Sequence, residues 1–99
     1  MMTFTQKARV DANQPQIVED LRKAGFSVKP VHQLKGFCDI VVGYQGRNYL
    51  FEIKDPNQPP SKRVLTDDEF KFHSEWKGQV NVAMSADDII YIINHSKVR

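Results

Sequence analysis

Two apolar segments near the middle of the chain, 38–43 and 48–54, have the composition of buried strands. Charged residues interrupt both of them: Asp39 lies in the first segment, and Glu52 and Lys54 lie in the second. Buried charges are costly unless they are paired or coordinate a metal ion. Charges at these three positions therefore require a partner or a function.

The connection between the two segments is short enough for a β-hairpin. A turn at Gln45–Gly46 pairs Tyr44 with Arg47. Counting back along the ladder then places Asp39 directly opposite Glu52. Residues opposed in this way have Cβ atoms about 4.5–5.5 Å apart.

Two ionised carboxylates at that spacing repel each other. At about 5 Å the repulsion is roughly 3 kcal/mol for an effective dielectric of 20. Strand periodicity places Lys54 on the same face as Glu52. Mg²⁺ typically takes one or two protein carboxylates and completes its shell with water and phosphate. We therefore expect a Mg²⁺ site between Asp39 and Glu52.

The length of the chain, 99 residues, predicts a single domain over 1–99. A domain of this size buries a smaller fraction of its surface on folding than a larger domain does, so self-association would stabilise it, and we expect a homodimer. The net charge of +2, with basic residues spread along the chain, does not by itself indicate a nucleic-acid partner. No apolar run approaches membrane-spanning length, so no membrane partner is expected.

The lone Cys38 cannot form an internal disulfide. The first residues, 1–7, lack the apolar stretch of a secretory signal, so we expect a reducing, cytoplasmic location. Strand alternation places Cys38 on the face opposite Asp39, which predicts core packing rather than a nucleophile.

Capping and periodicity signals locate the other elements. They predict helices over about 14–24, 66–77 and 86–95, and further strands over 26–31 and 79–84. The helix starts are indicated by Asn13 with Gln16, Thr66 with Glu69, and Ser85 with Asp88. We expect 1–12 to be an N-terminal arm and the proline-rich 55–65 to be a mobile, functional loop. Because the last strand–helix–strand passage implies a parallel pairing, the predicted fold is α/β, with a mixed central sheet flanked by helices.

An Asp on one strand followed by Glu-x-Lys on the next resembles the signature of the PD-(D/E)XK nuclease superfamily. Within it, the chain most resembles the small phage-type VRR-NUC (virus-type replication-repair nuclease) domains, over nearly its whole length. The motifs that carry the resemblance are Gly36-Phe37-Cys38-Asp39, Phe51-Glu52-Ile53-Lys54, Arg9-x-Asp11-x-Asn13-Gln14, Pro59-Pro60-Ser61-x-Arg63-x-Leu65-Thr66 and Glu69-x-x-Phe72-His73-x-x-Trp76-x-Gly78.

The resemblance implies a restriction-endonuclease-like αβββαβ core and metal-dependent hydrolysis of DNA phosphodiester bonds. Asp39, Glu52 and the backbone carbonyl of Ile53 would then hold Mg²⁺, for which Mn²⁺ could substitute. Lys54 would orient or help deprotonate the attacking water. Many relatives complete the site with a Glu in the first helix. That place falls on Gln14, whose neutral amide oxygen adds no charge.

The expected contacts with DNA phosphates come from Lys62 and Arg63 on the loop and from Arg9 in the arm. Because a domain this small has little surface for sequence readout, branched or flapped DNA is the expected substrate. The alternative is a catalytically weak or inactive nucleic-acid-binding or assembly module on the same fold, which Gln14 would allow.

Each site residue also has a structural alternative. The Asp39, Glu52 and Lys54 set could be a structural ion cluster, and Gln14 could satisfy only backbone groups at the helix start. The remaining candidates have equally plain alternatives: a solvated loop for Lys62 and Arg63, a local network at the helix start for Arg9, Asp11 and Asn13, and a half-buried residue beside core aromatics for His73. His32 and His95 have no partners at metal-ligand spacing.

Overall fold

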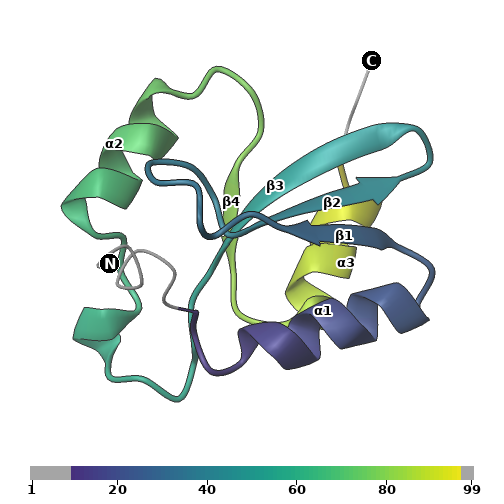
Figure 1. Ribbon diagram of the computed structural model, residues 1–99, viewed down its shortest axis with the longest axis horizontal. Coiled ribbons are helices and arrows are strands. Elements are labelled where there is room, and N and C mark those ends of the chain that lie inside the picture. Colours follow the sequence, from purple (N-terminus) through teal and green to yellow (C-terminus); the bar gives the residue numbers. More distant parts are fainter. Residues whose placement is uncertain (1–9, 97–99) are drawn as a thin grey trace, which may run out of the picture.

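A four-stranded mixed sheet organises the chain, and the computed structural model describes residues 10–96 (Figure 1). The strand order is β1-β2-β3-β4; β1 and β2, and β2 and β3, pair antiparallel, whereas β3 and β4 pair parallel. The elements are α1 (Gln14–Lys23), β1 (Ser27–Pro30), β2 (Ile40–Tyr44), β3 (Arg47–Ile53), the 3₁₀ turn η2 (Pro60–Lys62), α2 (Asp67–Glu75), β4 (Asn81–Ala83) and α3 (Ala86–Asn94). The α/β class, the αβββαβ order and the mixed sheet are all confirmed.

The β2–β3 hairpin turns where the sequence predicts. Tyr44 pairs with Arg47, and the two residues between them have positive φ angles, 51° for Gln45 and 80° for Gly46. Two successive positive φ angles define the type I′ turn, whose twist matches that of the flanking strands. Gly46 adopts this conformation without strain, which fixes the register of the ladder leading to the candidate site.

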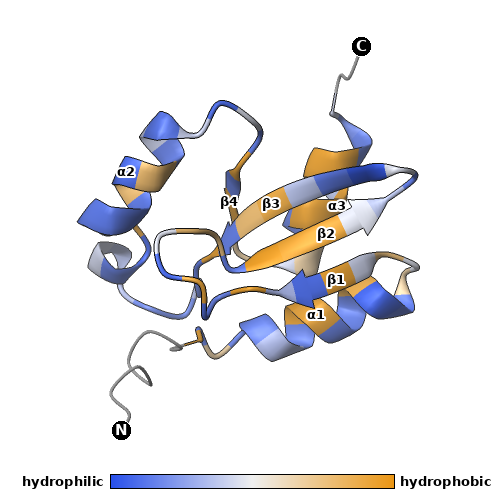
Figure 2. Cartoon of the chain, turned by 45° about the horizontal axis from the view of Figure 1, so that its top comes forward, coloured by the Kyte–Doolittle hydropathy of each residue, from blue (hydrophilic) through white to orange (hydrophobic). Residues whose placement is uncertain are grey.

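The hydrophobic core lies between one face of the sheet and the helices α1 and α3, which contact each other (Figure 2). Alternate strand residues Ile40, Val42, Phe51 and Ile53 supply the sheet side of this core. Leu21 of α1 and Ile89 of α3, both fully buried, are among the helical residues that cover it. Among the helices within residues 10–96, none combines the length and apolar character needed to cross a membrane.

Helix α2 stands apart from the other two helices, beyond the end of the sheet (Figure 1). None of its residues is buried. An aromatic cluster of Phe37, Phe72 and Trp76 holds it against the loop before β2, with ring centroids 5.1–6.0 Å apart. Its first turn carries the predicted capping box, in which Thr66 and Glu69 satisfy each other's backbone N–H groups. The helix therefore depends on its cap and on a few contacts rather than on the core.

Candidate active site

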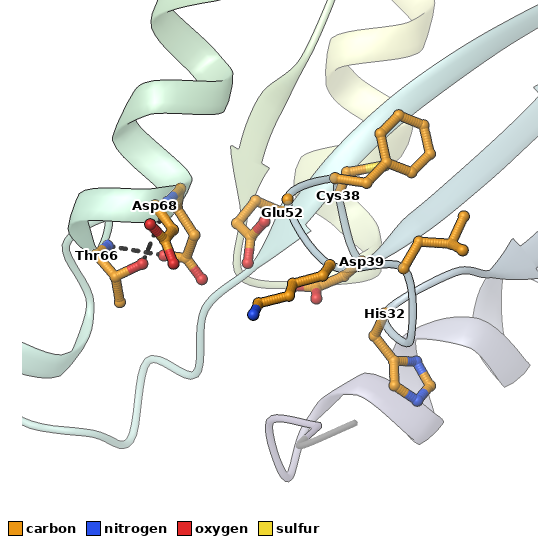
Figure 3. Close-up of a pocket in the computed structure, with 11 residues that line it drawn as sticks. His32, Cys38, Asp39, Glu52, Thr66 and Asp68 are labelled. Carbon is orange, nitrogen blue, oxygen red and sulfur yellow. Dashed lines mark hydrogen bonds between the residues drawn. The ribbon is translucent and has the colours of Figure 1, made fainter. Parts of the chain in front are cut away.

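A cavity of about 290 Å³ opens between the loop that precedes β2 and the start of α2 (Figure 3). Asp39 and Glu52 both line it, and Asp68 and Glu69 of α2 form the opposite wall. Its other lining residues are His32, Leu34, Lys35, Gly36, Phe37, Cys38 and Thr66. With four acidic side chains and one lysine, the cavity attracts cations.

The β2–β3 ladder keeps the predicted register and ends at Ile40 opposite Phe51, one residue before the predicted pair of Asp39 and Glu52. The N–H of Asp39 donates to the Phe51 carbonyl at 3.0 Å. Asp39 Oδ2 accepts the Ile53 N–H at 2.7 Å. This bond orients the carboxylate, and Asp39 and Glu52 still share the cavity (Figure 3).

Glu52 is almost fully buried at the end of β3. Burial, followed by the neighbouring carboxylates of Asp39 and Glu69, raises the pKa of Glu52 to about 10. The ionised form is therefore strongly disfavoured in the absence of a cation. A positive ion in this cavity would remove that penalty.

Lys54 lies two residues beyond Glu52 and is buried, as its place on the Glu52 face predicts. Its Nζ donates to Glu69 Oε1 at 2.7 Å. Burial alone would lower the pKa of Lys54, but the hydrogen bond and charge of Glu69 outweigh it and raise the pKa. The side chain of Lys54 is therefore a charged ammonium, fixed by Glu69 and lying beside the carboxylates of the site.

Gln14 is buried at the first position of α1, with 3% of its surface exposed. Its Nε2 lies 3.4 Å from Nδ1 of His32, which lines the cavity. Its Oε1 is buried and has no hydrogen-bond partner among residues 10–96. An unpaired buried oxygen is costly, so a ligand or a water molecule is the expected partner.

Asn13 was predicted to cap α1, but its side chain makes no cap hydrogen bond. Its Nδ2 instead donates to the carbonyls of Lys54 and Met84, each at 3.1 Å. This single amide therefore ties the start of α1 to the ends of β3 and β4, next to the site.

We expect Asn13→Ala to lower the free energy of unfolding by about 1–3 kcal/mol, because it leaves two half-buried carbonyls without their donor. The corresponding fall in melting temperature is about 5–15 °C for a domain of this size. Thermal unfolding of the variant beside Asn48→Ala, a change at an exposed strand residue, measures it. A melting temperature for Asn13→Ala equal to that of the control would contradict the assignment.

Two of the three residues predicted to contact DNA, Lys62 and Arg63, lie in the described part of the chain. Lys62 is exposed at the end of η2, and Arg63 follows it; neither lines the cavity that holds Asp39 and Glu52. Arg9 lies outside the described residues. The segment 55–65, predicted to be irregular, contains one 3₁₀ turn closed by hydrogen bonds from the N–H groups of Lys62 and Arg63.

The remaining sequence assignments concern packing. Cys38 is buried, its Sγ–H donates to the Ile40 carbonyl at 3.4 Å, and burial raises the pKa of its thiol to about 12. A neutral, buried thiol agrees with the packing role. His73 is half-buried with its ring 5.9 Å from that of Phe72, also as expected.

Sequence reasoning missed several polar residues around the site. Glu69 was read only as a capping residue, and His32 was set aside for lack of metal-ligand spacing, yet both line the cavity. Asp55 is buried directly after Lys54, and its Oδ1 accepts the Asn57 N–H at 2.9 Å. Asp11, named from the sequence only in a motif ahead of α1 and in a local network at the helix start, also belongs to this environment. Burial raises its pKa, and the charges of Asp39, Asp55 and Glu69 add to this against the opposing effect of Lys54. The signals visible in the sequence were the Thr66–Glu69 spacing and the two motifs that contain Asp11 and Glu69.

The donors present fit a hard divalent cation. Asp39 and Glu52 line the cavity and offer carboxylate oxygens, and Mg²⁺ needs only one or two carboxylates. Gln14 does not line this cavity, and its contact with a lining residue is the one to His32. Within residues 10–96, no group of three or more His, Cys, Asp or Glu side chains is arranged to hold a metal ion. The fit therefore rests on the carboxylate pair and on neutral oxygens.

Comparison with solved structures identifies the fold. A structure described as a VRR_NUC domain matches this chain with a TM-score of 0.57 and 21% sequence identity, covering 85% of this chain and 92% of that one. No protein-family model matches the sequence, and no curated protein matches it. The predicted likeness to a VRR-NUC domain is confirmed for the fold.

Proposed function

We propose that this chain is a Mg²⁺-dependent DNA nuclease that hydrolyses phosphodiester bonds. The observation that carries the proposal is the cavity in which the Asp39 and Glu52 carboxylates meet, with the ammonium of Lys54 held beside them. The likeness in fold to a structure described as a VRR_NUC domain supports the same function.

Asp39 and Glu52 would hold the cation, with the Ile53 carbonyl as a further backbone donor. The side chain of Ile53 is buried in the core, so only its backbone is available to the site. When bound, Mg²⁺ supplies a Lewis acid that polarises the phosphate and lowers the pKa of water. The Ile53 N–H fixes the orientation of Asp39, which keeps the ligand geometry constant through the reaction.

Lys54 supplies positive charge where negative charge develops on the phosphate. Its ammonium donates hydrogen bonds, so it also orients the water that attacks the phosphorus. Lys35 lines the cavity and is exposed, which places a second cation where a DNA phosphate would enter. Lys62, Arg63 and Arg9 would contact further phosphates of the DNA.

Incubation of the purified protein with labelled duplex, single-stranded, flapped and branched DNA tests the proposal. Cutting that requires Mg²⁺ or Mn²⁺ and stops with EDTA is the expected result, with branched or flapped DNA cut fastest. The neutral Gln14 favours a second candidate, a nucleic-acid-binding or assembly module with little catalysis. DNA binding at low salt without cutting in any divalent metal would favour that candidate.

We further propose that the protein is a cytoplasmic homodimer. Large hydrophobic side chains are exposed on the described surface, including Phe70, Val64 and Tyr91, each 63% exposed. A symmetric dimer would bury part of this surface and present two sites to the two strands of a duplex. Light scattering is expected to give twice the chain mass of 11.4 kDa. A mass of one chain at working concentration would rule out the dimer.

A further inference from the structure

Glu69 connects the lysine of the candidate site to the start of α2. A single oxygen of this residue, Oε1, accepts hydrogen bonds from Lys54 Nζ at 2.7 Å and from the Thr66 N–H at 2.9 Å. The backbone N–H of Glu69 in turn donates to Thr66 Oγ1 at 3.3 Å. The capping box of α2 therefore also binds the side chain of Lys54.

The Lys54–Glu69 pair is well shielded from water. The side chain of Lys54 is 8% exposed and that of Glu69 is 24% exposed, whereas the pairs Lys23–Glu19 and Lys71–Glu75 are more than half exposed on both sides. Charge-assisted hydrogen bonds are stronger where water is excluded. Of these three ion pairs in residues 10–96, Lys54–Glu69 is therefore the one best shielded from water.

Lys54 needs such an anchor because it lies among carboxylates. A lysine side chain has four rotatable carbons and loses considerable rotamer freedom when it is fixed. Besides Glu69, the carboxylates whose charge acts on Lys54 are those of Glu52 and Asp11, and Glu52 is one of the two residues that would hold the cation. Glu69 therefore keeps the ammonium beside the ligand set but out of it.

We propose that Glu69 is a positioning residue, which acts through Lys54 and holds its ammonium in the place required for phosphodiester cleavage. The proposal rests on the nuclease function proposed above. It goes beyond that function because it gives the capping residue of α2 a part in catalysis. A purely structural Glu69 would stabilise the helix start and leave the reaction unchanged.

Thr66→Ala provides a matched control. It removes the hydroxyl that accepts the Glu69 N–H and so weakens the cap, but it keeps the Thr66 backbone N–H and the Lys54–Glu69 pair. Glu69→Ala removes both the cap and the pair. Glu69→Gln retains the capping box and a neutral acceptor for Lys54.

Cleavage kinetics of the full chain in saturating Mg²⁺ are expected to separate the three variants. Misplacement of a catalytic group by about 1 Å can cost about 10²-fold, so kcat should fall by about 10²-fold in Glu69→Ala, with KM for DNA within about threefold of wild type. Glu69→Gln should recover part of the loss, and Thr66→Ala should remain within about threefold of wild type in kcat. Equal losses of kcat in Glu69→Ala and Thr66→Ala would overturn the proposal.

Acylation of Lys54 in the metal-free protein, mapped by peptide mass spectrometry, gives a readout that does not depend on activity. Lys54 should react faster in Glu69→Ala and at the wild-type rate in Thr66→Ala. An unchanged rate in Glu69→Ala would overturn the proposal. A wild-type protein that cuts no DNA in any divalent metal would overturn the proposed function and the positioning role together. If the wild type cuts DNA and Glu69→Ala cuts it equally fast, only the positioning role is overturned.

Discussion

Replacing Glu52 with glutamine is expected to reduce Mg²⁺-dependent DNA cleavage by about 10³-fold or more. The amide retains the size of the side chain but removes one of the two cavity-lining carboxylates proposed to hold the cation. Loss of a single preorganised group that stabilises transition-state charge already costs about 10²–10³-fold, and loss of a cation ligand should cost at least as much. Initial rates on the DNA that the wild type cuts fastest measure the effect.

Glu19→Gln is the matched control for this substitution. Glu19 lies on the exposed face of α1 in an i,i+4 pair with Lys23, with 57% of its side chain exposed. The same chemical change there should leave the rate within about twofold of wild type, since exposed ion pairs contribute little. Cleavage by Glu52→Gln at the wild-type rate would show that the observed activity arises elsewhere, from another site or a contaminant.

The same substitution is expected to stabilise the protein when no metal is present. Burial and the carboxylates of Asp39 and Glu69 raise the pKa of Glu52 from 4.5 to about 10. Between these values the unfolded chain releases the proton and the folded protein keeps it, so the free energy of unfolding falls as the pH rises. Glutamine does not titrate, and Glu52→Gln therefore lacks this loss.

At pH 8 in EDTA, we expect Glu52→Gln to melt at least about 5 °C above wild type. Each pKa unit by which folding raises the pKa of Glu52 lowers the free energy of unfolding at this pH by about 1.4 kcal/mol. Each kcal/mol shifts the melting temperature of such a domain by about 4–8 °C. At pH 4.5 the difference should be much smaller, because Glu52 is then protonated in the folded wild type and already half protonated in the unfolded chain. The lowered pKa of His73 also makes stability depend on pH. Because the wild type and Glu52→Gln both contain His73, this contribution cancels in the difference between their melting temperatures.

Saturating Mg²⁺ at pH 8 should reverse this order. Binding to the folded state alone stabilises it by about 2.7 kcal/mol at a hundredfold excess over the dissociation constant, and only the wild type retains both carboxylates. Thermal unfolding of both proteins with and without Mg²⁺ at the two pH values is the measurement. If metal-free Glu52→Gln melts below the wild type at pH 8, the Glu52 carboxylate is already stabilised by a group of the protein, and the prediction is wrong.

Local sequence signals were sufficient to predict most of the fold. The type I′ turn at Gln45–Gly46 fixes the hairpin register, and apolar periodicity identifies the helices that cover the core. Capping pairs predicted the start of α2 at Thr66 and that of α3 at Ser85, because these bonds join residues only three apart. Such features depend on neighbouring residues, so the sequence contains them directly.

The details of the site depend on contacts between distant residues. Asp39 lies just beyond the end of the β2–β3 ladder, and its side chain binds the Ile53 N–H, 14 positions away. Asn13 binds carbonyls 41 and 71 positions away, and Lys54 binds Glu69 across 15 positions. A linear pattern predicts which residues are charged and which face of a strand they share, but not which distant group becomes their partner.

Diffraction from crystals soaked in Mn²⁺, at a wavelength where manganese scatters anomalously, tests the central claim most directly. The account predicts one strong anomalous peak within coordination distance of oxygens from both Asp39 and Glu52, and its absence in Glu52→Gln crystals soaked in the same way. Wild-type crystals with no peak between these two carboxylates, or with manganese bound only elsewhere, would contradict it.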